Sequence, residues 1–346
     1  MTDIKSMTLE EITEAMRAAG EPSFRGKQVF AWLHRGATAF DQMLNIPKPL
    51  REKLAEQYCI TAPEVARRQV SKLDGTIKYL WELADGNCIE TVLMSYHHGN
   101  TVCISSQVGC RMGCRFCAST LDGLERNLTP GEMLDQIYAI TRYTEERVSN
   151  VVVMGTGEPM DNYDNLLTFI KMLTDEHGLH ISQRNITVST CGLVPMMKKL
   201  AEEELQITLA LSLHAVTDEK RRELMPIANK YSIAELMEAC DYYFAKTGRR
   251  ISFEYSLVGG VNDTKEDAEG LIALAGKRNC HINLIPVNPI KERDYVQSEK
   301  EAIMAFKGRL EKSHINVTVR REMGRDIDGA CGQLRRKKMQ EKKEQQ

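Results

Sequence analysis

The chain repeats one pattern from residue 101 to residue 320: a short apolar strand, a loop and an amphipathic helix. This repetition constrains the fold more than any other feature. Strand–helix alternation favours parallel strands joined by right-handed crossovers. The number of strands, and the lack of a dinucleotide-binding fingerprint, favour a partial (β/α) barrel over a doubly wound sheet. Strands are predicted at 101–106, 150–154, 185–189, 206–211, 250–256, 281–286 and 316–320, with helices between them, for example at 129–143, 165–174 and 232–245.

Three cysteines lie within eight residues, in the run Cys110-Arg-Met-Gly-Cys114-Arg-Phe-Cys117, shortly after the first predicted strand. Three thiolates on one loop can hold three irons of a four-iron, four-sulfur cluster. Because such clusters usually have four protein ligands, a missing fourth ligand leaves one iron free to bind a small molecule. The C-x3-C-x2-C spacing, with Phe116 before the last cysteine, resembles the motif of the radical-SAM superfamily, in which that molecule is S-adenosylmethionine.

Two other interpretations of these cysteines are a zinc site and a set of structural thiols. Zinc sites usually combine two C-x2-C or H-x3-H pairs that are distant in the sequence. Only Cys114 and Cys117 have that spacing, and no second pair occurs. Free cysteines are often buried in cores, but the arginines and the glycine between these cysteines do not fit a core element. The sequence therefore favours the cluster.

Several predicted strands end in small or polar residues, and chemistry in (β/α) barrels takes place at the carboxyl ends of the strands. Each signal is weak alone, because a glycine-rich turn after a strand is usually only a turn, and a lone histidine is as often a structural hydrogen-bonding group. Together they predict a ring of polar groups around one mouth. We expect Glu158 to accept a hydrogen bond from the amino group of S-adenosylmethionine, and the others to bind its carboxylate, ribose or adenine. The residues of the predicted cofactor site are Gly157, Glu158, Ser189, Ser212, Leu213, His214 and Asn288.

Five runs spread over the chain resemble one family, the radical-SAM methyltransferases that modify C2 of an adenosine in large-subunit ribosomal RNA. They are Cys103-Ile-Ser-Ser-Gln-Val-Gly-Cys110, Gly155-Thr-Gly-Glu-Pro159, Leu211-Ser-Leu-His214, Leu224-Met-Pro226 and Asp328-Gly-Ala-Cys331-Gly-Gln-Leu334. The resemblance implies a substrate at the peptidyl transferase centre of 23S ribosomal RNA and, as in some members, the transfer-RNA adenosine 3′ to the anticodon. A sister branch methylates C8 of the same ribosomal adenosine and differs from this sequence at Pro159, which favours C2.

The resemblance also implies a mechanism, because C2 of adenine is electron-poor and cannot simply attack a sulfonium methyl group. Cys331 is methylated by one S-adenosylmethionine, and a second is cleaved to a 5′-deoxyadenosyl radical that takes hydrogen from the methyl group. The resulting thiomethylene radical adds to C2, Glu90 removes the C2 proton, and Cys103 attacks the sulfur of Cys331 to form a disulfide. Reduction then resets the enzyme. The implied cofactors are a [4Fe-4S] cluster and two S-adenosylmethionine molecules per turnover, with flavodoxin or ferredoxin as electron donor.

We therefore expect an α/β protein built on a partial (β/α)6-type radical-SAM barrel, with a small N-terminal helical domain and a β-hairpin extension. Residues 1–60 are predicted to form an RNA-binding helical domain, with Arg25, Lys27, His34 and Arg35 as its basic residues. Residues 61–97 form the β-hairpin extension, 98–334 the barrel with its catalytic cysteine loop, and 335–346 a basic tail. The tail, and the arginine pairs at 67–68, 221–222, 249–250 and 320–321, are candidate RNA contacts. A disordered solubilising end is an alternative for the tail.

Composition bears on location and partners. The ten cysteines are scattered outside the motif, unlike a disulfide framework, and the polar N-terminus does not resemble a signal peptide. No apolar run approaches the length of a membrane span. We therefore expect a cytoplasmic, monomeric protein without a membrane partner. The net charge of −2 means that RNA contacts must come from local basic patches.

Three competing functions stay open at this point. A radical-SAM enzyme acting on a metabolite or peptide would not need Cys331 as a methyl carrier. A non-catalytic iron–sulfur or zinc module that binds nucleic acid would not cleave S-adenosylmethionine. Methylation at C8 is the third, because physics alone does not separate two carbons of one base.

Overall fold

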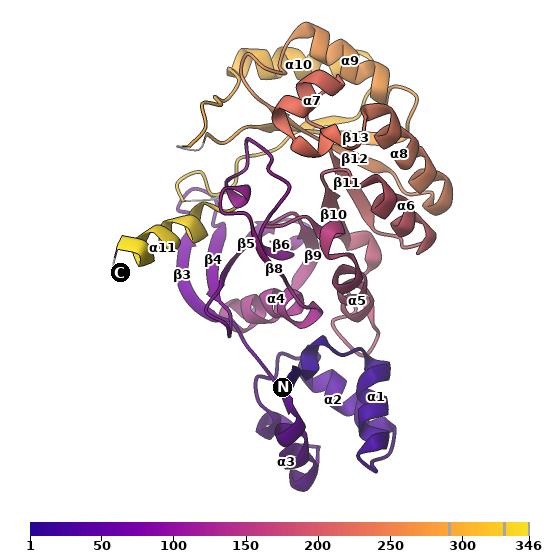
Figure 1. The fold of residues 1–346 in the computed structure, drawn as a ribbon, viewed down its shortest axis with the longest axis vertical. Coiled ribbons are helices and arrows are strands. Elements are labelled where there is room, and N and C mark those ends of the chain that lie inside the picture. The colour runs from indigo at the N-terminus through magenta and orange to yellow at the C-terminus, as the bar shows by residue number, and fades with distance from the viewer. Residues whose placement is uncertain (290–291, 328–329, 345–346) are drawn as a thin grey trace.

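The computed structural model describes residues 1–289, 292–327 and 330–344, with side chains up to residue 341. Its centre is a ten-stranded sheet in the order β14-β13-β12-β11-β10-β9-β6-β5-β4-β3 (Figure 1). The seven strands between β14 and β6 in this order, both included, are parallel to one another. They are β6 (Gly99–Cys103), β9 (Val148–Val153), β10 (Ile186–Thr190), β11 (Thr208–Ser212), β12 (Ile251–Leu257), β13 (Cys280–Pro286) and β14 (Val317–Val319).

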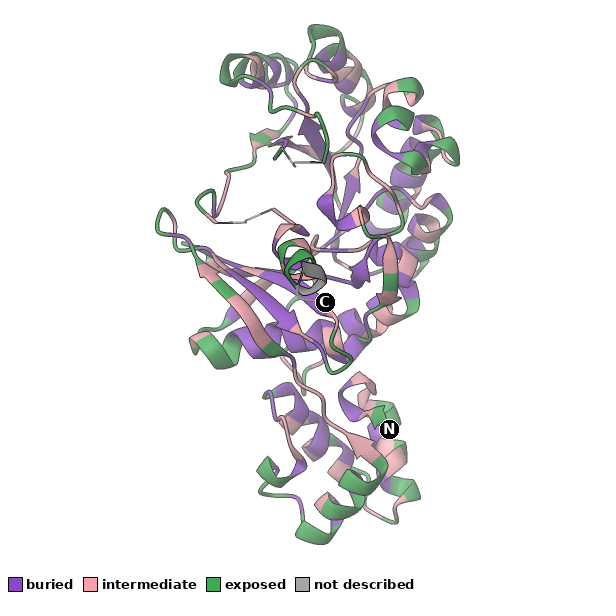
Figure 2. Cartoon of the chain, turned by 60° about the vertical axis from the view of Figure 1, so that its left-hand side comes forward, coloured by how far each residue is buried: buried purple, intermediate pink, exposed green. Residues whose placement is uncertain are grey.

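The predicted partial barrel is confirmed, because every predicted parallel strand forms and, among the described residues, the edge strands β14 and β3 do not pair with each other. Helices follow the strands and cover the sheet on its outside (Figure 1). They are α4 (Pro130–Thr144), α5 (Tyr163–Thr174), α6 (Val194–Glu202), α7 (Asp218–Leu224), α8 (Ile233–Thr247), α9 (Lys265–Ala275) and α10 (Lys300–Lys312). Figure 2 shows the buried sheet enclosed by helices whose outer faces are exposed.

Local sequence explains where these helices begin. Thr129 caps α4 by accepting from the backbone N–H of Glu132, and the Glu132 side chain accepts from the Thr129 backbone N–H in return. Ser232 and Glu235 form the same capping box at the start of α8. A cap of this kind contributes about 1 kcal/mol to helix stability. The helix starts therefore follow from short sequence signals that do not depend on the rest of the fold.

The predicted β-hairpin extension is part of the central sheet. Strands β3 (Glu64–Val70), β4 (Ile77–Glu82) and β5 (Cys88–Tyr96) pair antiparallel, and β5 also pairs antiparallel with β6. The expected boundary between residues 97 and 98 thus falls in the turn between β5 and β6. This continuity places β5 directly beside β6, the strand that carries Cys103, and β4 one strand further away.

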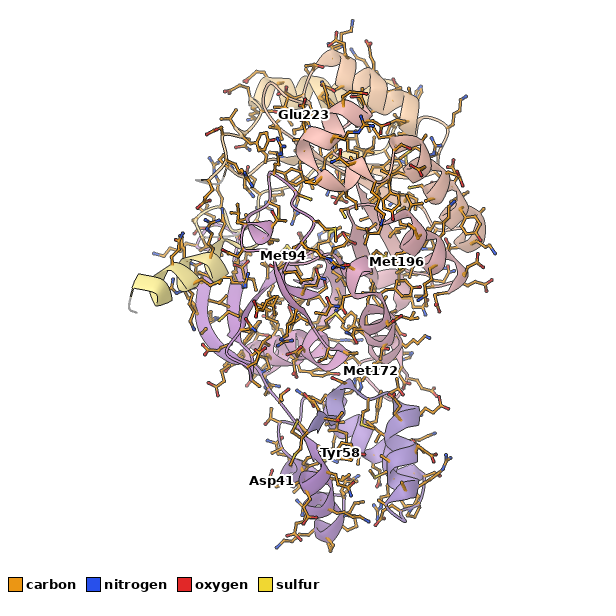
Figure 3. All side chains as sticks on the ribbon, in the orientation of Figure 1. Asp41, Tyr58, Met94, Met172, Met196 and Glu223 are labelled. Carbon is orange, nitrogen blue, oxygen red and sulfur yellow. The ribbon has the colours of Figure 1, made fainter. Side chains whose placement is uncertain are left out.

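The N-terminal region contains α1 (Leu9–Ala18), α2 (Phe24–His34) and α3 (Lys48–Gln57), and the two-residue strands β1 (Thr2–Asp3) and β2 (Tyr58–Cys59). It forms a lobe below α4 in Figure 1, and Asp41 and Tyr58 lie in it in Figure 3. A buried ion pair between Lys5 and Asp135 joins it to the barrel. The Tyr138 hydroxyl lies 2.6 Å from Nδ1 of His34. His34 is therefore buried at this junction rather than available for RNA, and burial lowers its pKa to about 3.

The predicted basic tail forms helix α11 (Gln333–Glu344), which lies beside β3 and β4 (Figure 1). Several of its charged side chains contact oppositely charged residues of the same molecule. Lys338 pairs with Glu82, Arg336 with Glu292, and Glu341 with Arg67. The basic side chains in these pairs are already engaged within the chain, and the segment is an ordered part of the sheet's surface.

No helix among the described residues is long and apolar enough to cross a membrane.

Candidate active site

The three motif cysteines lie together at the carboxyl ends of the parallel strands. Cys110 follows the short strand β7 (Gln107–Gly109), which pairs with β8 (Leu124–Asn127), and Cys117 precedes a 3-10 helix at Ala118–Thr120. All three cysteines line one cavity of about 240 Å³, here called the cysteine cavity. Glu158 also lines this cavity. The sequence predicted this meeting of the cysteine loop and Glu158, and it is confirmed.

The chemistry of the three thiols fits an iron–sulfur cluster. Burial raises the pKa of Cys110 to about 12, and burial together with the neighbouring cysteines raises the pKa of Cys114. A cationic iron reverses this balance by binding the deprotonated sulfur. Among the described residues, no three His, Cys, Asp or Glu side chains converge tightly enough to bind one metal ion. Three thiols that line one cavity can each bind one iron of a cluster.

Glu158 is held at the cysteine cavity by the backbone. Its carboxylate accepts hydrogen bonds from the backbone N–H groups of Cys191, at 2.7 Å, and Met160, at 3.1 Å. Burial raises the pKa of Glu158, and these hydrogen bonds lower it in part. A buried carboxylate with this environment gains from a cationic partner. The ammonium group of an amino acid is such a partner.

His214 lines the same cavity as a neutral imidazole. Its Nδ1 accepts from the backbone N–H of Ser256 at 2.9 Å, and burial, with a smaller contribution from Arg221, lowers its pKa to about 3. The proton of the neutral ring is therefore on Nε2. The ring meets Phe116 edge-to-face, with 4.8 Å between the centroids. This arrangement provides a hydrogen-bond donor in the cavity beside the cysteine loop.

The structure brings most of the predicted cofactor residues together, but not all of them. Gly157, Ser189 and Ser212 line the cysteine cavity with Glu158 and His214. Leu213 is fully buried in the hydrophobic core, and its contribution is a carbonyl that accepts from the Arg221 side chain. Asn288 lies on a second cavity instead. The sequence missed both points, because strand-end position does not show on which side of the mouth a side chain lies.

That second cavity, here called the arginine cavity, measures about 380 Å³ and borders the first. Met94, which lines it, is labelled in Figure 3. Its polar and charged lining includes Cys103, Cys331, Asn288, Arg320, Arg321 and Arg325. Cys331 lines both cavities. One sulfur atom can therefore face two different ligands.

Cys103 and Cys331 form a hydrogen-bonded pair of free thiols. The hydrogen bond from Cys103, aided by the charge of Lys78, lowers the pKa of Cys331, whereas that bond and burial raise the pKa of Cys103. Sγ of Cys331 lies 3.6 Å from the carbonyl oxygen of Met154. Cys331 is thus the sulfur of the pair that ionises first, as a nucleophile requires.

The structure does not bring Glu90 into either cavity. Its carboxylate accepts from the backbone N–H of Gly332 at 2.6 Å and of Arg335 at 2.7 Å, and it lies 2.9 Å from Nζ of Lys78. The predicted proton acceptor is therefore occupied on both oxygens. As placed here, Glu90 contacts the backbone beside Cys331 and lines neither cavity.

Arg221, listed among the candidate RNA contacts, is fully buried. Its guanidinium donates to the carbonyl oxygens of Cys191 at 2.7 Å, Leu213 at 3.1 Å and Ser212 at 3.2 Å. It therefore fixes the ends of β10 and β11 at the cysteine cavity and does not contact solvent. The pair of adjacent arginines in the sequence gave no indication of this difference between Arg221 and its neighbour.

Sequence reasoning also missed residues of the site. Cys191 and Glu254 line the cysteine cavity, and Lys78 lies buried beside Glu90. Glu254 and Lys78 share one signal that was available: each is a charged residue within a strand of otherwise mostly apolar or aromatic residues. A charge in such a strand needs a partner once it is buried.

Gly157 offers a test of the cavity wall. Its φ is +112°, and a Cβ there would lie 2.7 Å from the side-chain atoms Cβ of Gln107 and Oγ of Ser106. We expect Gly157→Ala to destabilise the fold by about 1–3 kcal/mol, because strain and overlap add, and to weaken S-adenosylmethionine binding. Thermal unfolding and equilibrium dialysis measure the two effects. Gly86→Ala is the matched control, since φ is +80° there but nothing lies within 4 Å; equal behaviour of the two variants would contradict the expectation.

Comparisons with known proteins identify the family of the chain. Residues 104–275 match the family model described as the radical SAM superfamily, and residues 2–60 match the N-terminal domain model of ribosomal RNA large subunit methyltransferases. A crystal structure of a radical SAM methyltransferase from Sphaerobacter thermophilus superposes with a TM-score of 0.91 at 43% identity, covering 96% of this chain and 99% of that one.

Curated relatives extend the likeness over the full chain. A protein from Lachnospira eligens called probable dual-specificity RNA methyltransferase RlmN is 65% identical, over 99% of this chain and 98% of its own length. A relative of the same description from Lachnoclostridium phytofermentans is 61% identical, over 96% of this chain and 94% of its own length. The chain therefore belongs to the RlmN family of dual-specificity RNA methyltransferases, within the radical-SAM superfamily.

Proposed function

We propose that this protein methylates C2 of an adenosine at the peptidyl transferase centre of 23S ribosomal RNA, and of the adenosine 3′ to the anticodon in some transfer RNAs. The observation that carries the proposal is the position of Cys331. It lines both the cysteine cavity and the arginine cavity, and it is hydrogen-bonded to Cys103. A methyl carrier needs access to a methyl donor and to an acceptor, and a resolving thiol within reach.

The cysteine cavity suits S-adenosylmethionine and the cluster. Cys110, Cys114 and Cys117 would bind three irons of the cluster. Glu158 would bind the ammonium group of S-adenosylmethionine, and Nε2–H of His214 would donate a hydrogen bond to a polar group of the same ligand. The cluster, when bound, supplies the electron that cleaves S-adenosylmethionine. Two S-adenosylmethionine molecules are used per turnover in this scheme, one to methylate Cys331 and one to activate that methyl group.

The arginine cavity suits the RNA base. Arg320, Arg321 and Arg325 place cationic groups at a cavity that reaches Cys103 and Cys331. Guanidinium groups bind phosphate oxygens strongly. A base in folded RNA would have to leave its stack to enter the cavity. The arginines are then suited to hold the phosphates on either side of it.

Each cysteine has one role in the proposed cycle. The Cys331 thiolate would take a methyl group from one S-adenosylmethionine, which leaves as S-adenosylhomocysteine. After a hydrogen atom of that methyl group has passed to the 5′-deoxyadenosyl radical, the carbon would bond to C2, and the adduct would lose one electron, for which the oxidised cluster is the acceptor, and its C2 proton, for which Glu90 is the candidate base. The Cys103 thiolate would then attack Sγ of Cys331. An S–S bond forms as the S–C bond breaks, which leaves a methyl group on the base after protonation of its carbon. The disulfide then needs a reductant that supplies two electrons and two protons. We further propose flavodoxin or ferredoxin as the electron donor to the cluster, a cytoplasmic location and a monomeric state.

The test is a direct analysis of modified nucleosides. The cluster is reconstituted anaerobically, and protein, reductant and methyl-labelled S-adenosylmethionine are incubated with unmodified 23S ribosomal RNA or transfer RNA. We expect labelled 2-methyladenosine after digestion and mass spectrometry. A product of 8-methyladenosine would instead assign the chain the activity of the sister branch. Cleavage of S-adenosylmethionine without any labelled nucleoside would exclude these RNAs as substrates.

A further inference from the structure

Three neighbouring strands place two charged side chains in line with Cys103. Across the sheet, Lys78 of β4 pairs with Val92 of β5, and Val92 pairs with Cys103 of β6. Glu90 is two residues before Val92, so it points to the same face, because side chains alternate along a strand. Lys78 is 0% exposed and Glu90 3% exposed. Two opposite charges are thus buried on the face of the sheet that carries Cys103.

The two side chains hold the backbone on both sides of Cys331. Nζ of Lys78 donates to the carbonyl oxygen of Ala330 at 2.6 Å and lies 2.9 Å from the Glu90 carboxylate. The carboxylate accepts from Gly332 and Arg335, at the start of α11. These bonds reach the residue before Cys331, the residue after it, and the first turn of the helix that follows.

The segment also fits closely against the cysteine loop. A Cβ at Gly332, whose φ is +81°, would lie 2.7 Å from the backbone nitrogen of Ser119. Ser119 belongs to the 3-10 helix that directly follows Cys117. The loop therefore blocks movement of the segment in that direction, and the movement left open to it is away from the loop. The contacts of Lys78 and Glu90 oppose that movement.

Burial of the ion pair needs a reason beyond stability. Moving two charges out of water costs several kcal/mol per ion, and well-packed apolar residues are often as stable as a buried pair. In this site the pair makes hydrogen bonds to backbone groups that an apolar pair could not make. Its effect is therefore to fix where the segment of Cys331 lies.

We infer that Lys78 is a positioning residue, which acts together with Glu90 to hold Ala330–Gly332 so that Sγ of Cys331 stays against Cys103 at the junction of the two cavities. Lys78 is not among the residues that line either cavity, although its charge acts on Cys331. The importance of the position of Cys331 for catalysis rests on the proposed function. The contacts that hold Cys331 in this position do not depend on that function.

The first test measures how close the two sulfurs are held, without cluster, cofactor or RNA. Glutathione disulfide oxidises the two thiols to the Cys103–Cys331 disulfide and is itself reduced to two glutathione molecules, and the equilibrium is read by peptide mass spectrometry. The variant is Lys78→Met with Glu90→Gln, which removes both charges and leaves neither buried alone. We expect the equilibrium constant for the disulfide to fall about tenfold or more, because the effective concentration of the two thiols falls.

Lys338→Met is the matched control, because it removes an ion pair of α11 with Glu82 and does not touch the segment of Cys331. It is expected to keep the wild-type disulfide equilibrium. Circular dichroism and thermal unfolding show whether the double variant is folded. A folded double variant with an unchanged equilibrium constant would overturn the inference. If the double variant does not fold, two single variants replace it: Lys78→Arg, which keeps the charge, and Lys78→Met, which removes it. The inference is supported if Lys78→Met lowers the equilibrium constant for the disulfide and Lys78→Arg does not.

A second readout uses the enzyme with its cluster. Because neither residue lines the arginine cavity, we expect the double variant to lose kcat about tenfold while KM for RNA stays the same. Because an unfolded fraction also lowers the apparent kcat at unchanged KM, kcat is calculated per folded molecule from the fraction measured by circular dichroism. If wild-type protein does not methylate RNA at all, the proposed function fails, whereas the disulfide equilibrium still decides the role of Lys78.

Discussion

Cys331→Ala is expected to abolish RNA methylation, with a loss on the order of 10⁴-fold or more, the scale seen when a covalent nucleophile is removed. The reason is that Cys331 is the thiol with the lowered pKa and lines both cavities. Without it there is no sulfur to carry the methyl group. The measurement is labelled 2-methyladenosine in RNA, together with the label bound to the protein itself, and both are expected to vanish.

Cys103→Ala is expected to have an equally large effect on turnover but a different outcome. The methyl carrier is still present, so the bond between Cys331 and the base forms and cannot be resolved by a second thiol. We expect RNA attached covalently to the protein, seen as a nuclease-sensitive shift in denaturing electrophoresis. Loss of the hydrogen bond from Cys103 also raises the pKa of Cys331, so the methylation of Cys331 should shift to higher pH, since the thiolate is the reactive form.

Cys280→Ala is the control for both variants, because Cys280 is a buried thiol of β13 that lines neither cavity. It should retain full methylation and form no adduct. Free RNA, with normal yields of 2-methyladenosine, from Cys103→Ala would contradict the role of Cys103. Methylation by Cys331→Ala would show that the methyl group reaches the base without a protein carrier.

Loss of one motif cysteine is a further large effect that we expect. Cys114→Ala should leave reconstituted protein with much less iron, without the visible absorption of a cluster, and without cleavage of S-adenosylmethionine. The physical reason is that the variant lacks one of the three iron ligands and its negative charge, and the two remaining thiolates do not replace them. Iron analysis, absorption spectra and the yield of 5′-deoxyadenosine measure these effects.

Cys191→Ala is the matched control for Cys114→Ala, because Cys191 lines the same cavity but lies outside the motif. Its iron content should equal that of the wild type. If Cys191→Ala lost iron as Cys114→Ala does, four cysteines would hold the metal, and no iron would be left free for S-adenosylmethionine. The pair of variants therefore separates a three-cysteine site from a four-cysteine site.

The sequence by itself determined the features that depend on near neighbours in the chain. Strand–helix alternation predicted the parallel strands. The C-x3-C-x2-C spacing placed three cysteines on one loop, after the first of these strands. Capping pairs such as Thr129 and Glu132 fixed helix starts. Such signals are read within a few residues, so they survive without knowledge of the fold. The roles of Cys103 and Cys331 came from resemblance, because nothing local to either distinguishes it from a buried structural thiol.

The tertiary structure alone decided how these elements share space. It placed Asn288 on the second cavity, Leu213 in the core and Arg221 beneath the site, and it turned the basic tail into a docked helix. It also showed that Glu90 pairs with Lys78 and holds the segment of Cys331. Such facts depend on which strands become neighbours and on which face each side chain lies. The register of the sheet sets both, through contacts between residues distant in the sequence, and no local pattern encodes them.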